Sequence, residues 1–410
     1  MKKLTLFLIL GMLTLNIPLQ AQKSLDSYLI EAGQKNPELV SLFKSYLSVL
    51  EKIPQVGNLP DPQLAMAYFL FPVETRMGPQ RFKLSVNQFF PWFGILDAAE
   101  ERVAIEAKAR LEVFEEAKSR LFHEIRLAYF NLYFTSKAIR VSNDNLEFLS
   151  SLKRMVLIRI ESGEASSLDE IRLEIESGDL INEIADLDES IQTQWIRFDN
   201  LINSPDFGRP QIPDSFDNLE LSWSQSDIWS KLLEKNHLLL KTDFELSALQ
   251  VQKELAELEG MPDFNIGLDY IAVGKGSNNL SGKDALILPK IGISIPIYRD
   301  KYKAKIKEVS FLTQAKEAHK ENQINLLENS LVNILAEYRD ANRRIDLFQE
   351  QERLAFQALE ILESSLSTGD SPFEEVLRME RKRLGYSLSL AKAYRDKGIA
   401  ISYVNYLMGL

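Results

Sequence analysis

Two very long stretches of the chain repeat apolar residues at steps of three and four and lack both glycine and proline. They run from Ile95 to Ser162, 68 residues, and from Arg299 to Thr368, 70 residues. Such steps place apolar side chains on one seam between supercoiled helices, and the absence of helix breakers is typical of long helices. At 1.5 Å per residue, each predicted helix would be roughly 100 Å long.

A turn-forming segment follows each long stretch. Gly163 and Gly369 are placed as helix C-caps, and serine, aspartate or proline residues then begin a return helix. We expect each segment to be the tip of an antiparallel helical hairpin. The predicted tip residues are Ser162, Gly163, Glu164, Ala165, Leu168 and Asp169 in the first hairpin, and Thr368, Gly369, Asp370, Ser371, Pro372 and Phe373 in the second.

Four segments of about ten residues alternate apolar and polar positions with the period of a β-strand. They lie at about 63–72, 81–91, 263–273 and 285–297, and loops through Gly78 and over 274–284 separate them in pairs. Pro289 lies inside the fourth segment, where we expect a bulge or a strand start. Aromatic residues near the segment ends suggest an interfacial girdle of Tyr68, Phe71, Phe90, Trp92, Phe93, Tyr270 and Tyr298.

The order of these elements occurs twice in the chain. Asn36 recurs as Asn236, an offset of 200, and Gly163 recurs as Gly369, an offset of 206. Self-similarity on this scale indicates a duplicated unit of one helix of about 30 residues, two strands, a long helix, a tip and a return helix. The predicted divisions are a first repeat over 23–204, a proline-rich linker over 205–219 and a second repeat over 220–410.

The first 22 residues resemble a secretory signal peptide. Lys2 and Lys3 precede an apolar run, and Ala21 offers a small-residue cleavage site. Four strands leave two open edges, which lipid would not tolerate, so a membrane-inserted sheet would need more than one copy of the chain. Three copies would supply twelve strands.

Composition excludes several classes of function. The net charge of −11 argues against a nucleic-acid partner, and the absence of cysteine excludes thiolate metal sites and cysteine nucleophiles. Only three histidines are present, and Glu234 and His237 form the single Glu-x-x-His spacing, which occurs by chance on charged helices. No phosphate-binding or nucleophile motif occurs. We therefore expect no enzyme and no catalytic, cofactor or metal site.

The whole mature chain resembles the TolC family of outer-membrane efflux channels. The segments that carry the resemblance are Asn36–Leu39, Leu59–Pro62 and Gln88–Gly94, together with the two glycine-containing tips. The family implies a homotrimer with a twelve-stranded outer-membrane β-barrel continued by a twelve-helix periplasmic tube. It also implies a periplasmic adaptor (a membrane fusion protein) docking at the tips, and an inner-membrane pump as the energy source. The Pro-Asp-Pro and Pro-Trp-Phe-Gly segments look most like its heavy-metal efflux branch.

Several alternatives stay open at this level. The chain could instead be a periplasmic adaptor, which has one hairpin rather than two, or an exported coiled-coil scaffold. The acidic residues at the tips either stabilise the return helices through the helix dipole or line a lumen. Lys83 and Asp269 either set the selectivity of the lumen or belong to a solvated strand face. The cargo, whether small molecules or metal cations, is not specified by the residues.

Overall fold

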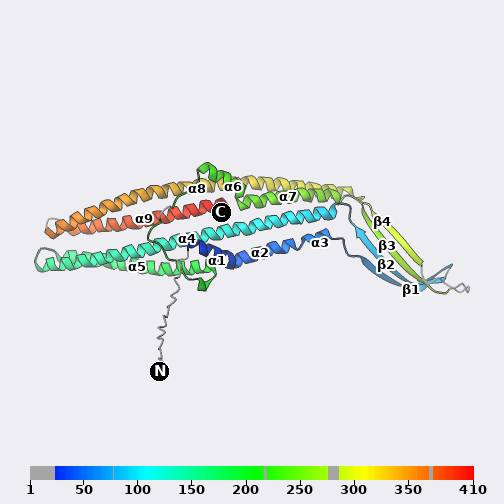
Figure 1. Cartoon of the computed structure of the whole chain (residues 1–410), viewed down its shortest axis with the longest axis horizontal. Coiled ribbons are helices and arrows are strands. Elements are labelled where there is room, and N and C mark those ends of the chain that lie inside the picture. The colour runs from blue at the N-terminus through cyan, green and yellow to red at the C-terminus, as the bar shows by residue number, and fades with distance from the viewer. Residues whose placement is uncertain (1–23, 77, 217–218, 276–285, 369–372) are drawn as a thin grey trace, which may run out of the picture.

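The computed structural model describes residues 24–76, 78–216, 219–275, 286–368 and 373–410. The protomer is elongated, with a layer of helices that carries a four-stranded sheet at one end and two hairpin tips at the other (Figure 1). The segment expected to be a signal peptide, 1–22, lies outside the described residues. So do four of the predicted tip residues, Gly369, Asp370, Ser371 and Pro372.

Two helices run the whole length of the layer. They are α4 (Ile95–Glu161) and α8 (Arg299–Thr368), with 67 and 70 residues. The return helices α5 (Ser167–Ile202) and α9 (Phe373–Leu407) pack antiparallel to them. Near the tips, neighbouring helices follow the order α5, α4, α9, α8, so α4 lies inside the layer and α8 lies at its edge.

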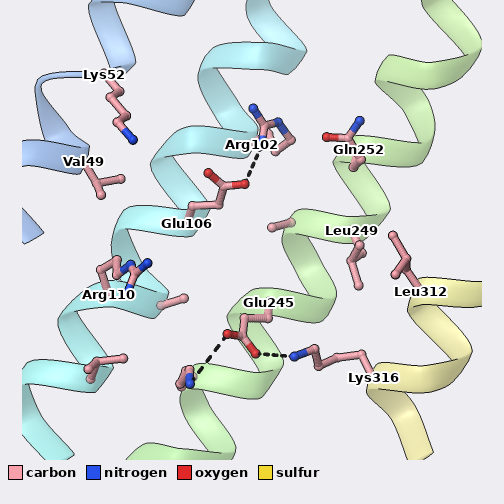
Figure 2. A pocket seen from close by; sticks show the side chains of 14 residues that line it. Val49, Lys52, Arg102, Glu106, Arg110, Glu245, Leu249, Gln252, Leu312 and Lys316 are labelled. Atoms are coloured by element: carbon pink, nitrogen blue, oxygen red, sulfur yellow. Dashed lines mark hydrogen bonds and ion pairs between the residues drawn. The ribbon is translucent and has the colours of Figure 1, made fainter. Parts of the chain in front are cut away.

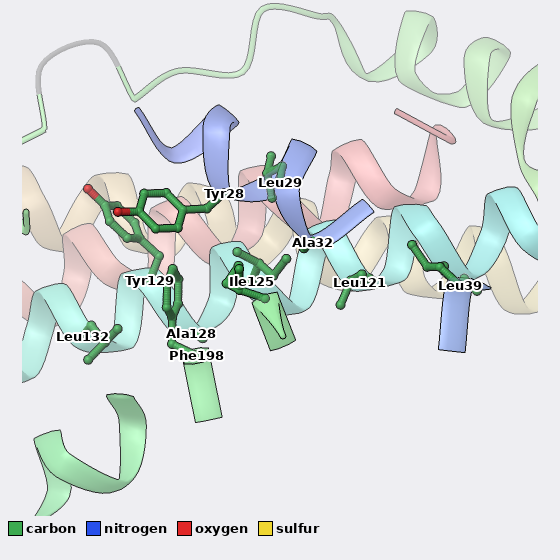
Figure 3. Packing of buried hydrophobic residues seen from close by; sticks show 12 residues of the cluster. Tyr28, Leu29, Ala32, Leu39, Leu121, Ile125, Ala128, Tyr129, Leu132 and Phe198 are labelled. Atoms are coloured by element: carbon green, nitrogen blue, oxygen red, sulfur yellow. The ribbon is translucent and has the colours of Figure 1, made fainter. Parts of the chain in front are cut away.

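The predicted seam forms the core. Leu121, Ile125 and Leu132 of α4 are buried against α1 (Leu25–Lys35), α2 (Pro37–Leu50) and the end of α5, as Figure 3 shows. On α8, the seam residues Leu327, Leu331 and Ile334 are buried in a second cluster with the C-terminal end of α9. The apolar residues at steps of three and four therefore mark the buried faces of both long helices.

The helix of about 30 residues expected before each strand pair is divided. The first is α1, α2 and a short α3 (Ile53–Gly57), and the second is α6 (Gln225–Lys235) and α7 (His237–Leu258). The divisions fall at Asn36 and Asn236, whose extended backbones end one helix and begin the next. Asparagine is a strong N-cap, because its side-chain oxygen accepts bonds from the free N–H groups of the first turn. A periodic apolar pattern alone does not register such a break.

Each asparagine also links the C-terminal end of a return helix to the N-terminal end of another helix, α5 to α2 and α9 to α7. The Asn36 side chain accepts from the N–H groups of Glu38 and Leu39 and donates to the carbonyl of Leu201 at the end of α5, 3.3 Å away. Asn236 accepts from the second and third residues of α7 and donates to the carbonyl of Leu407 at the end of α9, 2.9 Å away. One side chain thus forms hydrogen bonds with otherwise unpaired backbone groups at the ends of two helices. We call these two contacts the splices.

The sheet contains four antiparallel strands in chain order, so β1 and β4 are its edges. The strands are β1 (Gln63–Thr75), β2 (Gly78–Phe90), β3 (Asp263–Val273) and β4 (Leu286–Ser294). Gly78 begins β2 and does not lie in the loop. The fourth strand ends before Pro296, which has no N–H for the ladder.

The bulge or strand start expected at Pro289 is wrong. Pro289 pairs with Leu268 within a regular register that runs from Leu286 to Ser294. Within the described part of the protomer β4 pairs with β3 alone, and Pro289 does not interrupt this pairing.

The segment between the halves crosses the middle of the helical layer. It begins with the 3-10 turn η1 (Pro205–Phe207), and Phe207 meets Tyr28 edge-on at 5.0 Å between ring centroids. Further on, the Phe216 ring lies 4.6 Å from that of Tyr133. Glu220 accepts from Lys397 and from the Tyr338 hydroxyl, each at 2.6 Å, and these donors lower the pKa of Glu220. The linker is therefore held against the helices by specific contacts.

Candidate functional site: the sheet faces and the helical tips

One face of the sheet is apolar across all four strands. Cross-strand pairing places Leu64 beside Val86 and Leu268, and the next row contains Met66, Leu84 and Tyr270. Large apolar side chains on this face are exposed in the protomer, and on the edge strands they include Leu64, Met66, Tyr68, Leu70, Ile287, Ile291 and Ile293. An apolar exposed surface of this extent indicates contact with lipid or with another protein.

The other face carries a cluster of three charges. Asp269 is 1% exposed and lies between Lys83 and Lys290, with nitrogen–oxygen distances of 2.7 and 2.6 Å. Lys83 and Asp269 were predicted as candidates from the sequence, and the structure brings them together. Lys290 was not predicted, because a single lysine in a mostly apolar strand carries no signal of its own. The sheet is thus amphipathic, with apolar and polar faces on opposite sides.

The predicted girdle residues fall at different levels of the sheet. Phe90 ends β2, Trp92 and Phe93 lie in the connection to α4, and Tyr298 directly precedes α8. Tyr68 lies next to the midpoint of β1, and Phe71, which is 91% exposed, lies in the half of β1 farther from the helices. Tyr270 pairs with Leu84 and Ile287 inside the sheet rather than at its end.

An aromatic groove occurs where the sheet joins the helices. The Trp92 ring stacks on the Phe264 ring with 5.7 Å between centroids, and the backbone N–H of Trp92 donates to the Asp263 carboxylate at 3.1 Å. The groove of about 500 Å³ is lined by Leu59, Phe90, Pro91, Trp92, Phe93, Gly94, Leu96, Asp97, Phe264, Ile266 and Ile291. Gly94 adopts a φ of 84°, a left-handed conformation that lets the chain turn sharply from the strand connection into α4. We call this the aromatic groove.

The first tip is built from two standard helix-end structures. Gly163 has a φ of 81°, its N–H donates to the Ile160 carbonyl at 3.0 Å, and that of Glu164 donates to Arg159 at 2.8 Å. These two bonds form a Schellman end to α4. Ser166 and Asp169 then form a capping box at the start of α5. Asp169 therefore acts as a helix cap, whereas Ser162, Glu164 and Leu168 are exposed.

Contacts between the two hairpins lie just above the tips. Arg159 of α4 donates to the carbonyl of Leu366 on α8 at 2.7 Å, and Arg172 of α5 lies 3.4 Å from Glu374 of α9. Phe373, predicted as a docking residue, is buried in a cluster with Val376 and residues of α4 and α8. The backbone of Thr368 ends α8, whereas its side chain lies outside the described part of the structure.

A buried polar network above the tips was not found from the sequence. Glu380 of α9 accepts from the Asn145 side chain of α4 at 2.7 Å and from the Arg383 guanidinium at 2.8 Å. Glu363 of α8 lies nearby, and burial, together with the charge of Glu380, raises the pKa of Glu363. An acid in a charge-rich helix carries no sign that it is buried, so only tertiary packing identifies it.

Both edges of the helical layer expose apolar residues. On α5 they include Leu168, Ile171, Ile175, Ile181 and Ile196, and on α8 they include Leu312, Leu326, Leu347, Leu354 and Ile361. In both helices these positions lie away from the packed seam. The helical layer, like the sheet, therefore ends in two unpartnered edges.

Within the described residues, no group of three or more histidine, cysteine, aspartate or glutamate side chains is placed to hold a metal ion. None of the described helices combines the length and the apolar character needed to cross a membrane.

Comparison with solved structures identifies the fold. The outer-membrane protein VceC of Vibrio cholerae matches with a TM-score of 0.75 at 16% identity, over 93% of this chain and 95% of that one. The outer-membrane channel OprN matches with 0.78 at 16% identity, over 94% and 89%. CusC, described for its transmembrane channel formation, matches with 0.78 at 16% identity, over 94% and 91%.

No protein-family model and no curated protein matches the sequence. The similarity therefore lies in the fold, and it extends over nearly the whole length of both partners. The predicted fold class, mainly helical with a small antiparallel sheet as in these channels, is confirmed.

Proposed function

We propose that this chain, which shares its fold with outer-membrane channels, is the protomer of a passive conduit across the outer membrane. The observation that carries the proposal is the combination of an amphipathic sheet with a helical layer, each ending in two unpartnered edges. A single copy leaves the outer backbone groups of β1 and β4 unpaired, which is costly in lipid.

Closure by three copies removes these edges. The β4 of one protomer would pair with the β1 of the next, which gives a twelve-stranded barrel with the apolar face toward lipid. The exposed leucine and isoleucine residues on α5 and α8 would meet across the same boundaries and continue the barrel as a tube of twelve helices. The polar face with Lys83, Asp269 and Lys290 would then line the lumen.

The remaining parts of the proposal follow from the resemblance to efflux channels. The tube would extend into the periplasm, and the tips around Gly163 and Gly369 would dock a periplasmic adaptor and serve as the gate. An inner-membrane pump would supply the energy. The cargo would be small molecules, with metal cations as the alternative that the heavy-metal branch suggests. No catalytic role is part of this proposal.

The test is the state of the full-length protein extracted from outer membranes in detergent. Light scattering should give about 140 kDa for three chains of 46.9 kDa each, and electron micrographs should show a three-fold tube roughly 130 Å long. Reconstituted in planar bilayers, the trimer should conduct ions. A water-soluble monomer in the periplasmic fraction would instead favour the adaptor or the coiled-coil scaffold.

A further inference from the structure

A second groove lies among the helices between the sheet and the splices. It has a volume of about 690 Å³ and is formed by α4, α7 and α8 with the segment that ends α2, as Figure 2 shows. Its charged lining residues are Lys52, Arg102, Arg110, Lys241 and Lys316, with Glu106 and Glu245 as the acids. Five cations against two anions give the groove a charge of +3, in a chain whose net charge is −11. We call it the basic groove.

Both acids of the basic groove already have cationic partners. Glu106 bonds to Arg102, and Glu245 lies 2.9 Å from Lys316 and 3.8 Å from Lys241 (Figure 2). Lys52 and Arg110 are exposed, and neither has an ion-pair partner among the residues that the structure describes. The groove therefore holds cationic groups whose charge the protomer does not neutralise.

The size of the groove allows these charges to act on one ligand. The groove is elongated, because its lining on α4 runs from Arg102 to Val113, eleven residues or about 16 Å. An anion midway along it lies within about one screening length, about 8 Å in physiological salt, of either end, whereas an isolated surface lysine acts alone. Such convergence of cations favours ligands with several negative charges.

The position of the basic groove follows from the helical geometry of α4. Leu96 and Asp97 line the aromatic groove together with the apolar sheet face, whereas Arg102, Glu106 and Arg110 line the basic groove. Asp97 and Glu106 are nine residues apart, about two and a half helical turns, so they point to opposite sides of α4, whereas Leu96 and Arg110, fourteen residues apart, lie within about 40° of each other. The two grooves therefore lie at different levels of α4 and face only partly different sides.

We propose that the basic groove binds multivalent anions of the phosphate or polycarboxylate class as they pass through the conduit. The proposal rests on the proposed function, because it takes the basic groove to open into the lumen of the conduit. Lys83 and Lys290 on the polar sheet face are matched by two acids of the same face, Asp269 and Asp263. The preference for anionic cargo over metal cations therefore rests on the charge of the basic groove itself.

The probe is inorganic triphosphate, and the test variants are Arg110→Gln and Lys52→Gln. The matched control is Lys108→Gln, which removes the same charge from an exposed position of α4, about 200° around the helix from Arg110. Titration calorimetry on the folded detergent-extracted protein should show triphosphate binding. Each groove variant should weaken it about tenfold, and the control should leave it unchanged. Circular dichroism confirms that each variant is folded.

Conductance separates the two proposals. In planar bilayers, triphosphate should reduce the current, and the half-blocking concentration should rise about tenfold in the groove variants but not in the control. If the channel conducts but triphosphate neither binds nor blocks it, the anion site is overturned and the conduit stands. The same holds if triphosphate binds the wild type, the groove variants and the control with equal affinity. Binding that depends on Arg110 and Lys52 in a protein that does not conduct supports the site and overturns the conduit.

Discussion

The helices α4 and α8 have nearly the same length and the same kind of seam, yet their surroundings differ. α4 has neighbours on both sides, α2 and α5 on one and α7 and α9 on the other. In the described part of the chain, α8 packs mainly against α7 and α9 and is also touched by α6. The exposed leucine and isoleucine residues of α8 (Leu312, Leu326, Leu347, Leu354 and Ile361) are separated by multiples of seven residues. A heptad spacing outside the core is typical of a second coiled-coil seam. α8 thus carries a row of exposed apolar residues for which the described part of the protomer provides no packing partner.

The largest expected effect is the loss of assembly when charged residues replace exposed leucines in the second heptad row of α8. Leu354 is 44% exposed in the protomer. The variant Leu347→Asp with Leu354→Asp should abolish the trimer, because six carboxylates would be desolvated at three identical boundaries. Light scattering in detergent measures the mass. The matched control is Arg353→Asp, an exposed position that pairs with Glu350 on the same helix and lies about 120° around it from Leu347, which should leave the trimer intact. A trimer that survives the double variant would show that α8 lies outside the subunit boundary.

The next effect distinguishes the core of α4 from the edge of α8. Leu132 is fully buried in the cluster of Figure 3, so Leu132→Ala should destabilise the protomer by about 2–5 kcal/mol. Leu354→Ala should cost the protomer less than about 1 kcal/mol, because it removes a partly exposed side chain. Thermal unfolding followed by circular dichroism gives the order of the two variants. Equal losses in both would mean that α8 is as enclosed as α4.

The smallest effect is a pH dependence of stability that differs between the histidine of α4 and that of α8. His123 of α4 stacks on Tyr406 and lies 3.0 Å from the Ser402 hydroxyl, and burial, with a contribution from Arg126, lowers the pKa of His123 to about 4. The unfolded chain, with a histidine pKa of about 6.5, then binds this proton more readily than the folded chain does. Stability should consequently fall as the pH decreases from about 6.5 to 4, by about 2 kcal/mol after solvent screening.

Comparison with variants isolates the effect of His123. In His123→Gln, the acid-induced decrease in melting temperature over this interval should be smaller than in the wild type. The exposed His319 of α8 provides the control, and His319→Gln should follow the wild-type profile. A wild-type profile that His123→Gln leaves unchanged would contradict the buried, neutral state of His123.

The long helices were predictable because their signals are local. The run without glycine or proline from Arg299 to Thr368 is α8 itself, and Gly163 marks the end of α4 because only its positive φ allows the turn. Strand positions were predicted to within a few residues for the same reason. The ends shifted at Gly78 and Pro296, where a single residue decides whether the ladder continues.

The properties that the sequence did not reveal depend on contacts between distant segments. Asn36 and Asn236 were recognised as repeated residues, but their bonds to Leu201 and Leu407 connect positions 165 and 171 residues apart. Lys290 and Glu380 look like ordinary solvated charges until packing gives them partners. The basic groove combines residues of separate helices, so no single segment carries its charge pattern.

The splices have a consequence for how such a chain changes over evolution. The lines α5–α2 and α9–α7 are each interrupted and held by one amide, while α4 and α8 run beside them without a break. A turn gained or lost by one uninterrupted helix would misplace its tip unless the other helix and both return helices changed equally. At a splice, by contrast, the cap starts a new helix, so an added residue there need not shift the register of the helix that follows. The lengths of α4, α5, α8 and α9 should therefore change together or not at all.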